Sequence, residues 1–143
     1  MRISAKTDYA VRALVVLATR DPEGSRSVKA DEIARVAAVP GKFLEAILVL
    51  LRREGLIESK RGADGGYRLA RPAEEITVGD VVRAIDGPPA LVAGRPPQAL
   101  SSPEDASLAA EMWHGVAEAY IETLDGVAIA TLTTRLPTVD FQI

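Results

Sequence analysis

Apolar residues recur at spacings of three and four over the first third of the chain. One such stretch runs over Ala5–Arg20, follows Ser4 and stops at Asp21-Pro22; a shorter one covers Ala30–Ala37. A third begins directly after the tight connector 38–41, and its apolar stripe consists of Leu44, Ile47, Leu48 and Leu51. This spacing is typical of amphipathic helices, and Ser4 is a good helix cap. The pattern predicts three helices joined by short turns.

The pattern then changes to alternation. Residues 56–60 and 67–70 read as strands, and the glycine-rich segment 61–66 between them reads as a turn. Thr77 with Asp80 has the spacing of a capping box, which opens a helix over Val78–Asp86, with Gly87 as its C-terminal cap. We therefore expect a β-hairpin followed by a fourth helix.

Residues 88–101 are rich in proline and are expected to form an irregular loop. Ser102 and Pro103 suit the start of a long helix that stops at Asp125-Gly126. Its broad apolar stripe contains Trp113, Val116, Ala117, Tyr120 and Leu124. The expected organisation is a domain over 1–87, a loop over 88–101, and a long helix with a tail over 102–143.

Helix, short helix, turn, helix and hairpin is the element order of a winged helix-turn-helix domain. In that fold the third helix enters the DNA major groove and the hairpin, or wing, reaches the backbone or minor groove. Lys60 and Arg61 at the base of the wing, and its glycines, favour contact with phosphates. The fold class predicted is mainly α with a small β-hairpin wing; an ordinary hairpin with solvated charges is the alternative for the wing itself.

Charge is distributed unevenly. Residues 1–72 contain fourteen Lys and Arg and nine Asp and Glu, a net charge of +5. Residues 73–143 contain three Lys and Arg and eleven Asp and Glu, a net charge of −8, so the whole chain carries −3. A basic half suits phosphate, and an acidic half suits protein or solvent. No apolar run approaches the ~18 residues that span a bilayer, so we expect a cytoplasmic protein.

Several motifs together resemble the Rrf2 family of bacterial transcription regulators: Tyr9-Ala10-Val11-Arg12-Ala13-Leu14, Phe43-Leu44-Glu45, residues 61–72 from Arg61 to Pro72, and residues 76–87 from Ile76 to Gly87. The resemblance implies a homodimeric repressor held together by its long C-terminal helices, with two winged domains on a palindromic operator. Trp113, Val116, Tyr120 and Leu124 are then the dimerisation residues. Packing of the same stripe within one chain is the alternative.

Burial of the apolar stripe of the third helix leaves Lys42, Glu45 and Ala46 facing outward. A carboxylate repels phosphate, so Glu45 suits an acceptor for cytosine N4, with a solvated helix-face glutamate as the alternative; the resemblance also places it at a base-reading position. Lys42 is expected to meet phosphate or guanine, and Ala46 offers at most a methyl contact to thymine. Phe43 stands where the family often has tyrosine.

Arg61 is expected to enter a narrow minor groove. The remaining contacts are expected to hold phosphates; they come from Arg2, Lys60, Tyr67 and the amides of Gly65 and Gly66. The predicted partner is double-stranded DNA.

Relatives that bind an iron–sulfur cluster use cysteines in the loop that corresponds to 88–101, and this chain has no cysteine. Thiolates hold nearly all such clusters, so no cofactor and no metal site is expected; Asp8 and His114 alone are too few ligands. The switch is left open between a small molecule, a partner protein and no effector.

The residues also bear on two other classes of function, an enzyme and an adaptor. One histidine, no cysteine and no phosphate loop provide no catalytic constellation, so an enzyme is not expected. A winged-helix adaptor that uses its basic face for protein or RNA contacts is the remaining alternative.

Overall fold

The structure, a computed structural model, describes residues 2–96, 99 and 108–134. It is mainly helical with one two-stranded antiparallel hairpin, as the sequence predicts. In chain order the elements are α1 (Ala5–Arg20), α2 (Ala30–Ala37), α3 (Gly41–Arg53), β1 (Ile57–Lys60), β2 (Gly66–Leu69), the 3-10 turn η1 (Ala73–Glu75), α4 (Val78–Asp86), α5 (Leu108–Asp125) and α6 (Ile129–Thr133).

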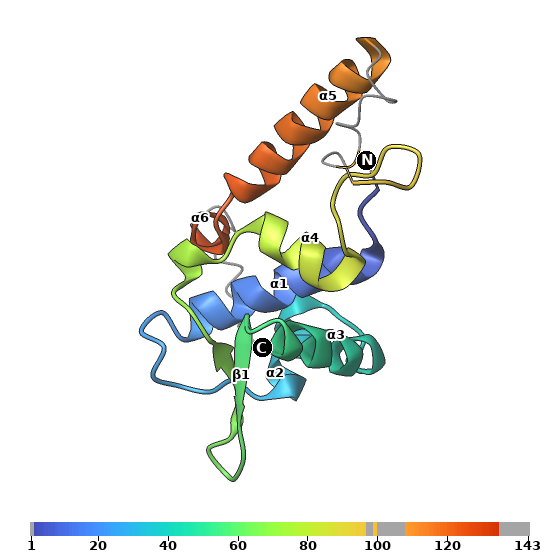
Figure 1. Ribbon diagram of the computed structural model, residues 1–143. Coiled ribbons are helices and arrows are strands. Elements are labelled where there is room, and N and C mark those ends of the chain that lie inside the picture. Colours follow the sequence, from blue (N-terminus) through green and yellow to red (C-terminus); the bar gives the residue numbers. More distant parts are fainter. Residues whose placement is uncertain (1, 97–98, 100–107, 135–143) are drawn as a thin grey trace.

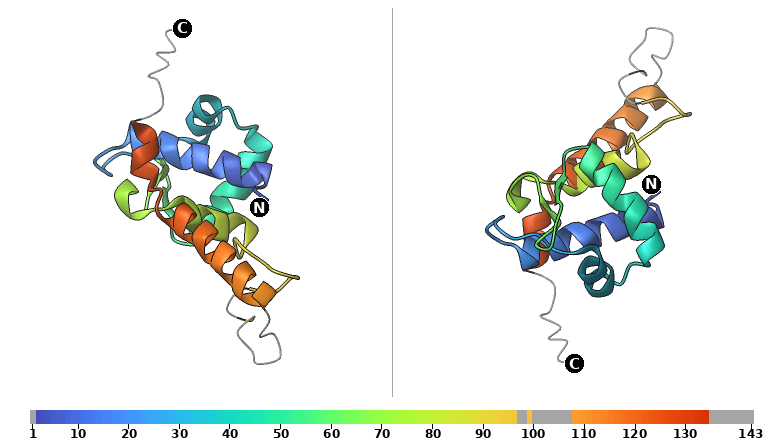
Figure 2. Two further views of the ribbon diagram at one scale, coloured as in Figure 1. Left: turned by 90° about the horizontal axis from the view of Figure 1, so that it is seen from above. Right: turned by 90° about the horizontal axis from the view of Figure 1, so that it is seen from below.

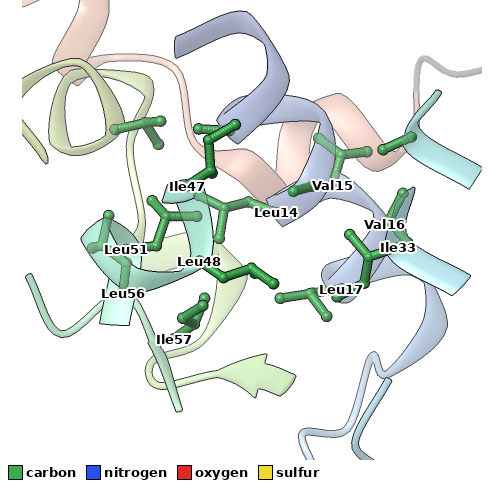
Figure 3. Packing of buried hydrophobic residues seen from close by; sticks show 14 of the residues in the cluster. Leu14, Val15, Val16, Leu17, Ile33, Ile47, Leu48, Leu51, Leu56 and Ile57 are labelled. Carbon is green, nitrogen blue, oxygen red and sulfur yellow. The ribbon is translucent and has the colours of Figure 1, made fainter. Parts of the chain in front are cut away.

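Helix α1 is the centre of the fold. It contacts α2, α3, α4, α6 and β2, so that most elements surround it (Figures 1 and 2). Its apolar side chains interdigitate with those of α2 and α3 in one cluster, in which Leu14, Leu17, Ile33, Ile47 and Leu51 are fully buried (Figure 3). Burial of each such side chain contributes about 1.5–3 kcal/mol, which makes this cluster the platform that fixes α3.

Local signals in the sequence account for the helix ends. The Ser4 Oγ accepts a hydrogen bond from the Thr7 amide at 3.1 Å, and Thr77 with Asp80 forms the predicted capping box. Gly55 has a φ of 72°, the left-handed conformation expected after α3. The predicted bounds of α1, α2 and α4 are confirmed.

The hairpin is anchored to the loop before α2. β1 and β2 pair with Ile57 opposite Leu69, and Val28 forms a bridge with Tyr67 through two backbone hydrogen bonds of 2.8 Å. A Cβ on Gly66 would collide with the Val28 carbonyl, and the φ of Gly66 is 147°. Only glycine therefore allows this close approach, which fixes the direction of the wing.

The C-terminal segment contains one helix that projects from the domain and one that packs on it. Helix α5 extends away from α1 (Figure 1), whereas the short helix α6 packs on α1 and buries Ile129 completely. The sequence predicts neither α6 nor η1. The expected helix start at Ser102 and Pro103 lies outside the described residues, and the described part of this helix begins at Leu108.

Helix α4 connects α5 to α1. Asp125 lies beside the N-terminal end of α4, and its carboxylate accepts two hydrogen bonds, at 2.8 and 2.6 Å, from Arg83 of the last turn of that helix. The Val78 amide donates to the Val127 carbonyl at 2.8 Å, and a Cβ on Gly79 would collide with Asp125. The hydrogen bond from Arg83, which outweighs the effect of burial, lowers the pKa of Asp125.

At the other end of α4, Asp86 binds the start of α1. Its carboxylate accepts hydrogen bonds from the hydroxyls of Ser4 and Thr7, both at 2.7 Å, and from the Ser4 amide at 3.2 Å. Burial acts to raise the pKa of Asp86, but these hydrogen bonds together outweigh it and leave the pKa below its ordinary value. Both ends of α4 are thus fixed by polar contacts far apart in sequence.

Candidate nucleic-acid interface

Helix α3 has one buried and one open side. Leu44, Ile47, Leu48 and Leu51 are at most 2% exposed and hold the helix against α1. The residues that the sequence predicts to face DNA are all exposed: Lys42, Phe43, Glu45 and Ala46. The structure therefore exposes all four, with Lys42 and Ala46 between the two flanks that carry Phe43 and Glu45.

The turn before α3 positions this surface. Ala38 adopts the left-handed conformation, and the Val39 amide donates to the Ala34 carbonyl at 2.9 Å while its side chain is buried. No acidic residue lies in the first turn of α3 and no side chain caps it. The positive end of the helix dipole is consequently uncompensated, which favours a nearby phosphate.

Contacts on either side of α3 show which flank faces which neighbour. Arg52 donates to the Ser59 hydroxyl of β1 at 3.2 Å. At 100° per residue, Glu45 lies on the same flank as Arg52, the one toward the wing. On the opposite flank the Phe43 ring lies 6.1 Å from the ring of Tyr9 in α1, and Arg12 covers Tyr9.

The tip of the wing is a tight turn. The Gly65 amide donates to the Gly62 carbonyl at 2.9 Å, and Gly62 has a φ of 107°. A Cβ on Gly65 would collide with the Lys60 carbonyl, and Gly65 is buried. The two glycines predicted to offer amides to phosphate, Gly65 and Gly66, are therefore required by the fold of the wing itself.

The cations of the wing differ in their partners. Arg68 is bound to the Glu58 carboxylate across the hairpin, with its Nε at 3.0 Å and its Nη2 at 2.9 Å. Lys60 and Arg61 are exposed, and the ion pairs among the described residues include neither of them nor Lys42. These three charges remain available to an anionic partner.

Tyr67 and Arg2, the other two side chains predicted to hold phosphates, differ in their exposure. Tyr67 is half-buried and packs against the apolar cluster, while its backbone pairs with Val28. Arg2 is exposed just ahead of Ser4, which Asp86 fixes at the start of α1. Of the two predicted phosphate contacts, Arg2 is thus the more accessible.

A recess of about 370 Å³ between the wing and the loop before α2 adds two cations that the sequence interpretation missed. Arg26 and Lys29 line it together with Lys60 and Arg68, and two acidic residues, Glu32 and Asp64, line it as well. The short strand predicted at Val28 is the feature that could have identified these two cations, because its pairing with Tyr67 brings the loop before α2 to the wing.

The long helix α5 has an open apolar flank. Trp113 and Val116 of the predicted set are 47% and 55% exposed, and Leu108 and Met112, which were not singled out, are 87% and 52% exposed. Tyr120 and Leu124 are half-buried, and the Tyr120 hydroxyl is buried without a hydrogen-bond partner among the described residues. The flank lies on the part of the molecule opposite the wing (Figure 1).

The residues present do not fit an iron–sulfur cluster. The chain contains no cysteine, and within the described ranges His, Asp and Glu side chains form no cluster of three that can hold a metal. Asp8 is paired with Arg12 at 2.7 Å, and His114 lies 3.2 Å from Glu118.

No helix in the described part of the chain combines the length and apolar character needed to cross a membrane.

Comparison with known proteins identifies this architecture. Residues 3–135 match the family model Rrf2, described as an iron-dependent transcriptional regulator. The regulator CymR of Bacillus subtilis is 34% identical over 134 residues, which cover 94% of this chain and 91% of CymR. IscR of Cereibacter sphaeroides is 42% identical over 86 residues, 60% of this chain and 56% of that protein.

A Mycobacterium tuberculosis protein, named only provisionally as an HTH-type transcriptional regulator, is 51% identical over 92 residues. The match spans 56% of that relative, so the chain covers only about half the length of several curated relatives.

Solved structures agree with the sequence matches. The structure of B. subtilis CymR, described as the global cysteine regulator, superposes with a TM-score of 0.78 at 30% identity and covers 96% of this chain and 99% of that one. IscR of T. potens superposes with a TM-score of 0.72 at 31% identity, over 94% and 87% of the two chains. The expectation of a regulator fold rather than an enzyme is confirmed, and the chain belongs to the Rrf2 family of transcriptional regulators.

Proposed function

We propose that this protein is a homodimeric repressor that binds a palindromic operator in double-stranded DNA and uses no iron–sulfur cluster. The observation that carries the proposal is the open side of α3, which presents Lys42, Glu45 and Ala46, together with a wing whose Lys60 and Arg61 form no ion pair with any residue that the structure describes. A helix and a hairpin arranged in this way match the two grooves of B-DNA.

Base recognition is assigned to α3. Glu45 is exposed and has no ion-pair partner among the described residues, so its carboxylate is available to accept from cytosine N4 in the major groove. It lies on the same flank of α3 as Arg52, about two turns before it, and not on the flank that faces Tyr9. Lys42 binds phosphate or guanine, and Ala46 meets a thymine methyl.

Phosphate contacts position the domain. Arg61 enters the minor groove, and Arg2, Lys60 and the loop cations Arg26 and Lys29 hold the backbone on either side. These contacts increase affinity without selecting sequence.

The dimer is assigned to the open flank of α5, which carries Leu108, Met112, Trp113 and Val116. A contiguous apolar flank of this kind marks an interaction surface, and two-fold pairing of identical helices is the commonest solution. The two winged domains then face half-sites about one helical turn of DNA, or a multiple of it, apart. Such a protein works where the chromosome is, in the bacterial cytoplasm.

The test is selection of DNA fragments by the purified protein from genomic DNA, followed by sequencing and by titration of the best duplex at several salt concentrations. We expect a palindromic sequence, an affinity that falls steeply with salt, and a specific component that survives competitor DNA. Binding only to single strands or to RNA, or no binding at all, would contradict the proposal and favour the adaptor function.

A further inference from the structure

The most outward line of α3 is apolar in its middle and basic at both ends. At 100° per residue, the direction opposite the buried stripe is shared by four residues, which we call the crest: Lys42, Ala46, Val49 and Arg53. All four are exposed, and Val49 is 57% exposed.

Val49 has no function in the fold. The core under α3 is formed by Leu44, Ile47, Leu48 and Leu51, and Val49 points to the opposite side. A β-branched residue is also a weaker helix former than alanine or a charged residue, so neither packing nor helix propensity explains it. A single exposed apolar side chain is ordinary on a protein surface, but this one lies in the centre of a proposed DNA-reading face.

The surroundings of Val49 and Ala46 specify the kind of partner. Lys42 and Arg53 lie at the two ends of the crest, where their long side chains reach phosphates across a groove, and Glu45 lies beside it. Between the phosphates, the floor of the major groove offers one apolar group, the C5-methyl of a pyrimidine. An apolar centre between cations complements that arrangement.

We infer that Val49, with Ala46, forms a methyl-reading patch that selects a pyrimidine carrying a C5-methyl group in each half-site. The inference rests on the proposed function and deepens it, because it adds Val49 to the methyl contact assigned to Ala46 and makes the C5-methyl group a selected feature of each half-site. Glu45 and Val49 are four residues apart, about 6 Å along the helix, so the methylated pyrimidine lies within about two base pairs of the cytosine.

Two natural bases carry this methyl group, thymine and 5-methylcytosine, and the experiment separates them. In the operator obtained by selection, each thymine of a half-site is replaced singly by deoxyuridine, which pairs identically and lacks only the methyl group. In a parallel series, each cytosine is replaced by 5-methylcytosine.

For wild-type protein we expect one position, or two neighbouring positions, at which affinity falls about fourfold on loss of the methyl group or rises about fourfold on its addition. A fall with deoxyuridine assigns the patch to thymine, and a rise with 5-methylcytosine assigns it to the modified base.

The protein variant Val49→Ala completes a double-mutant cycle. Its affinity for the methylated operator falls by a similar factor, and its response to the methyl group at that position disappears. Because Val49 is exposed and alanine favours helix, the variant folds, which a thermal melt verifies. Leu91→Ala removes an exposed apolar side chain (53%) outside this face and serves as the matched control, with an unchanged methyl response.

Sequence-specific binding whose affinity is the same with and without the methyl group at every position would overturn this inference and leave the proposed function intact. An equal methyl effect in wild type and Val49→Ala would also overturn it. Absence of any specific duplex binding by the wild-type protein would overturn both.

Discussion

Glutamate at position 45 is an unusual residue for a surface that approaches phosphates. Its carboxylate lies on the wing-side flank of α3, exposed, and forms no ion pair among the described residues. Repulsion from the DNA backbone makes such a residue costly unless a base donor compensates it. Glu45 is thus a residue whose removal is expected to change selectivity more than affinity.

We predict that Glu45→Ala relaxes the preference at one base pair in each half-site while overall affinity for mixed sequence is kept or rises. Selection from a randomised library, followed by sequencing, measures the preference. Glu74→Ala, which removes an exposed glutamate in η1, is the control and should leave the profile unchanged. An identical profile for Glu45→Ala and wild type would refute base reading by Glu45.

Arg61 is expected to behave in the opposite way. Arg61→Ala should weaken binding by about 1–3 kcal/mol and reduce the salt dependence, because a contact to the DNA is lost. Titrations at several salt concentrations measure both. Arg20→Ala, at the end of α1 and paired with Glu32, is the control; equal losses for both variants would mean that Arg61 acts only through net charge.

Single residues were predictable from the sequence where helical periodicity determines exposure. Because the apolar stripe of α3 is buried, the sequence predicts that Lys42, Glu45 and Ala46 face outward. The structure confirms that they are exposed. Arg26 and Met112 were missed for a different reason: their positions depend on the pairing of Val28 with the wing and on the side of α5 that packs on α4. Periodicity alone contains neither piece of information.

At the scale of elements, α4 is held at both ends by polar contacts. Gly79 allows the Asp125 carboxylate to approach, and Asp125 in turn binds Arg83. The contact that orients α5 relative to the domain therefore depends on glycine at position 79.

We predict that Gly79→Ala destabilises the protein by about 1–3 kcal/mol, since a methyl group there displaces Asp125. Urea unfolding measures the change in free energy. Gly41→Ala is the matched control: it is also a helical glycine, a Cβ there meets nothing within 4 Å, and it should be neutral or stabilising. An unchanged free energy of unfolding in Gly79→Ala would mean that the contact between Asp125 and α4 does not require glycine at position 79.

The carboxylates of Asp86, at the end of α4, and of Asp125, at the end of α5, predict how stability depends on pH. The folded-state pKa values of Asp86 and Asp125 are both lowered, so each contributes stability that is present above the unfolded Asp pKa of about 3.9 and is lost as the pH falls through the lower folded value. Thermal melts from about pH 6 to below pH 3 should show this loss, with a shallower dependence in Asp86→Asn and Asp125→Asn. An unchanged dependence in both variants would contradict these roles.

Among the elements, those with caps and long apolar periods were predictable, and short ones were not. α1, α2 and α4 begin and end as the sequence predicts because Ser4, Thr77 and the flanking turns act locally. α6 has five residues and no side-chain cap, and it is stabilised by packing of Ile129 on α1. Such a helix has little stability of its own, so its sequence carries little signal.

The whole molecule separates two surfaces. The wing lies at one end and α5 at the other (Figure 1), and the basic residues gather in the first part of the chain. A protein built in this way can contact DNA and a second copy of itself without competition between the two.

We predict that Val116→Asp on the open flank of α5 converts the protein from dimer to monomer and weakens binding to a palindrome far more than to a single half-site. Light scattering after gel filtration measures the mass. Glu111→Gln, on the acidic flank of the same helix, should leave the dimer intact. A Val116→Asp protein that keeps the wild-type mass would place the interface elsewhere.

The return of α6 to α1 also bears on how the protein is made. Ile129, which is fully buried against the centre of the fold, is synthesised only after α5 is complete. At roughly 5–20 residues per second, α1 waits on the ribosome for several seconds or more with part of its apolar face uncovered. A nascent chain that stops short of Ile129 therefore has an incomplete core and is a substrate for chaperones and proteases.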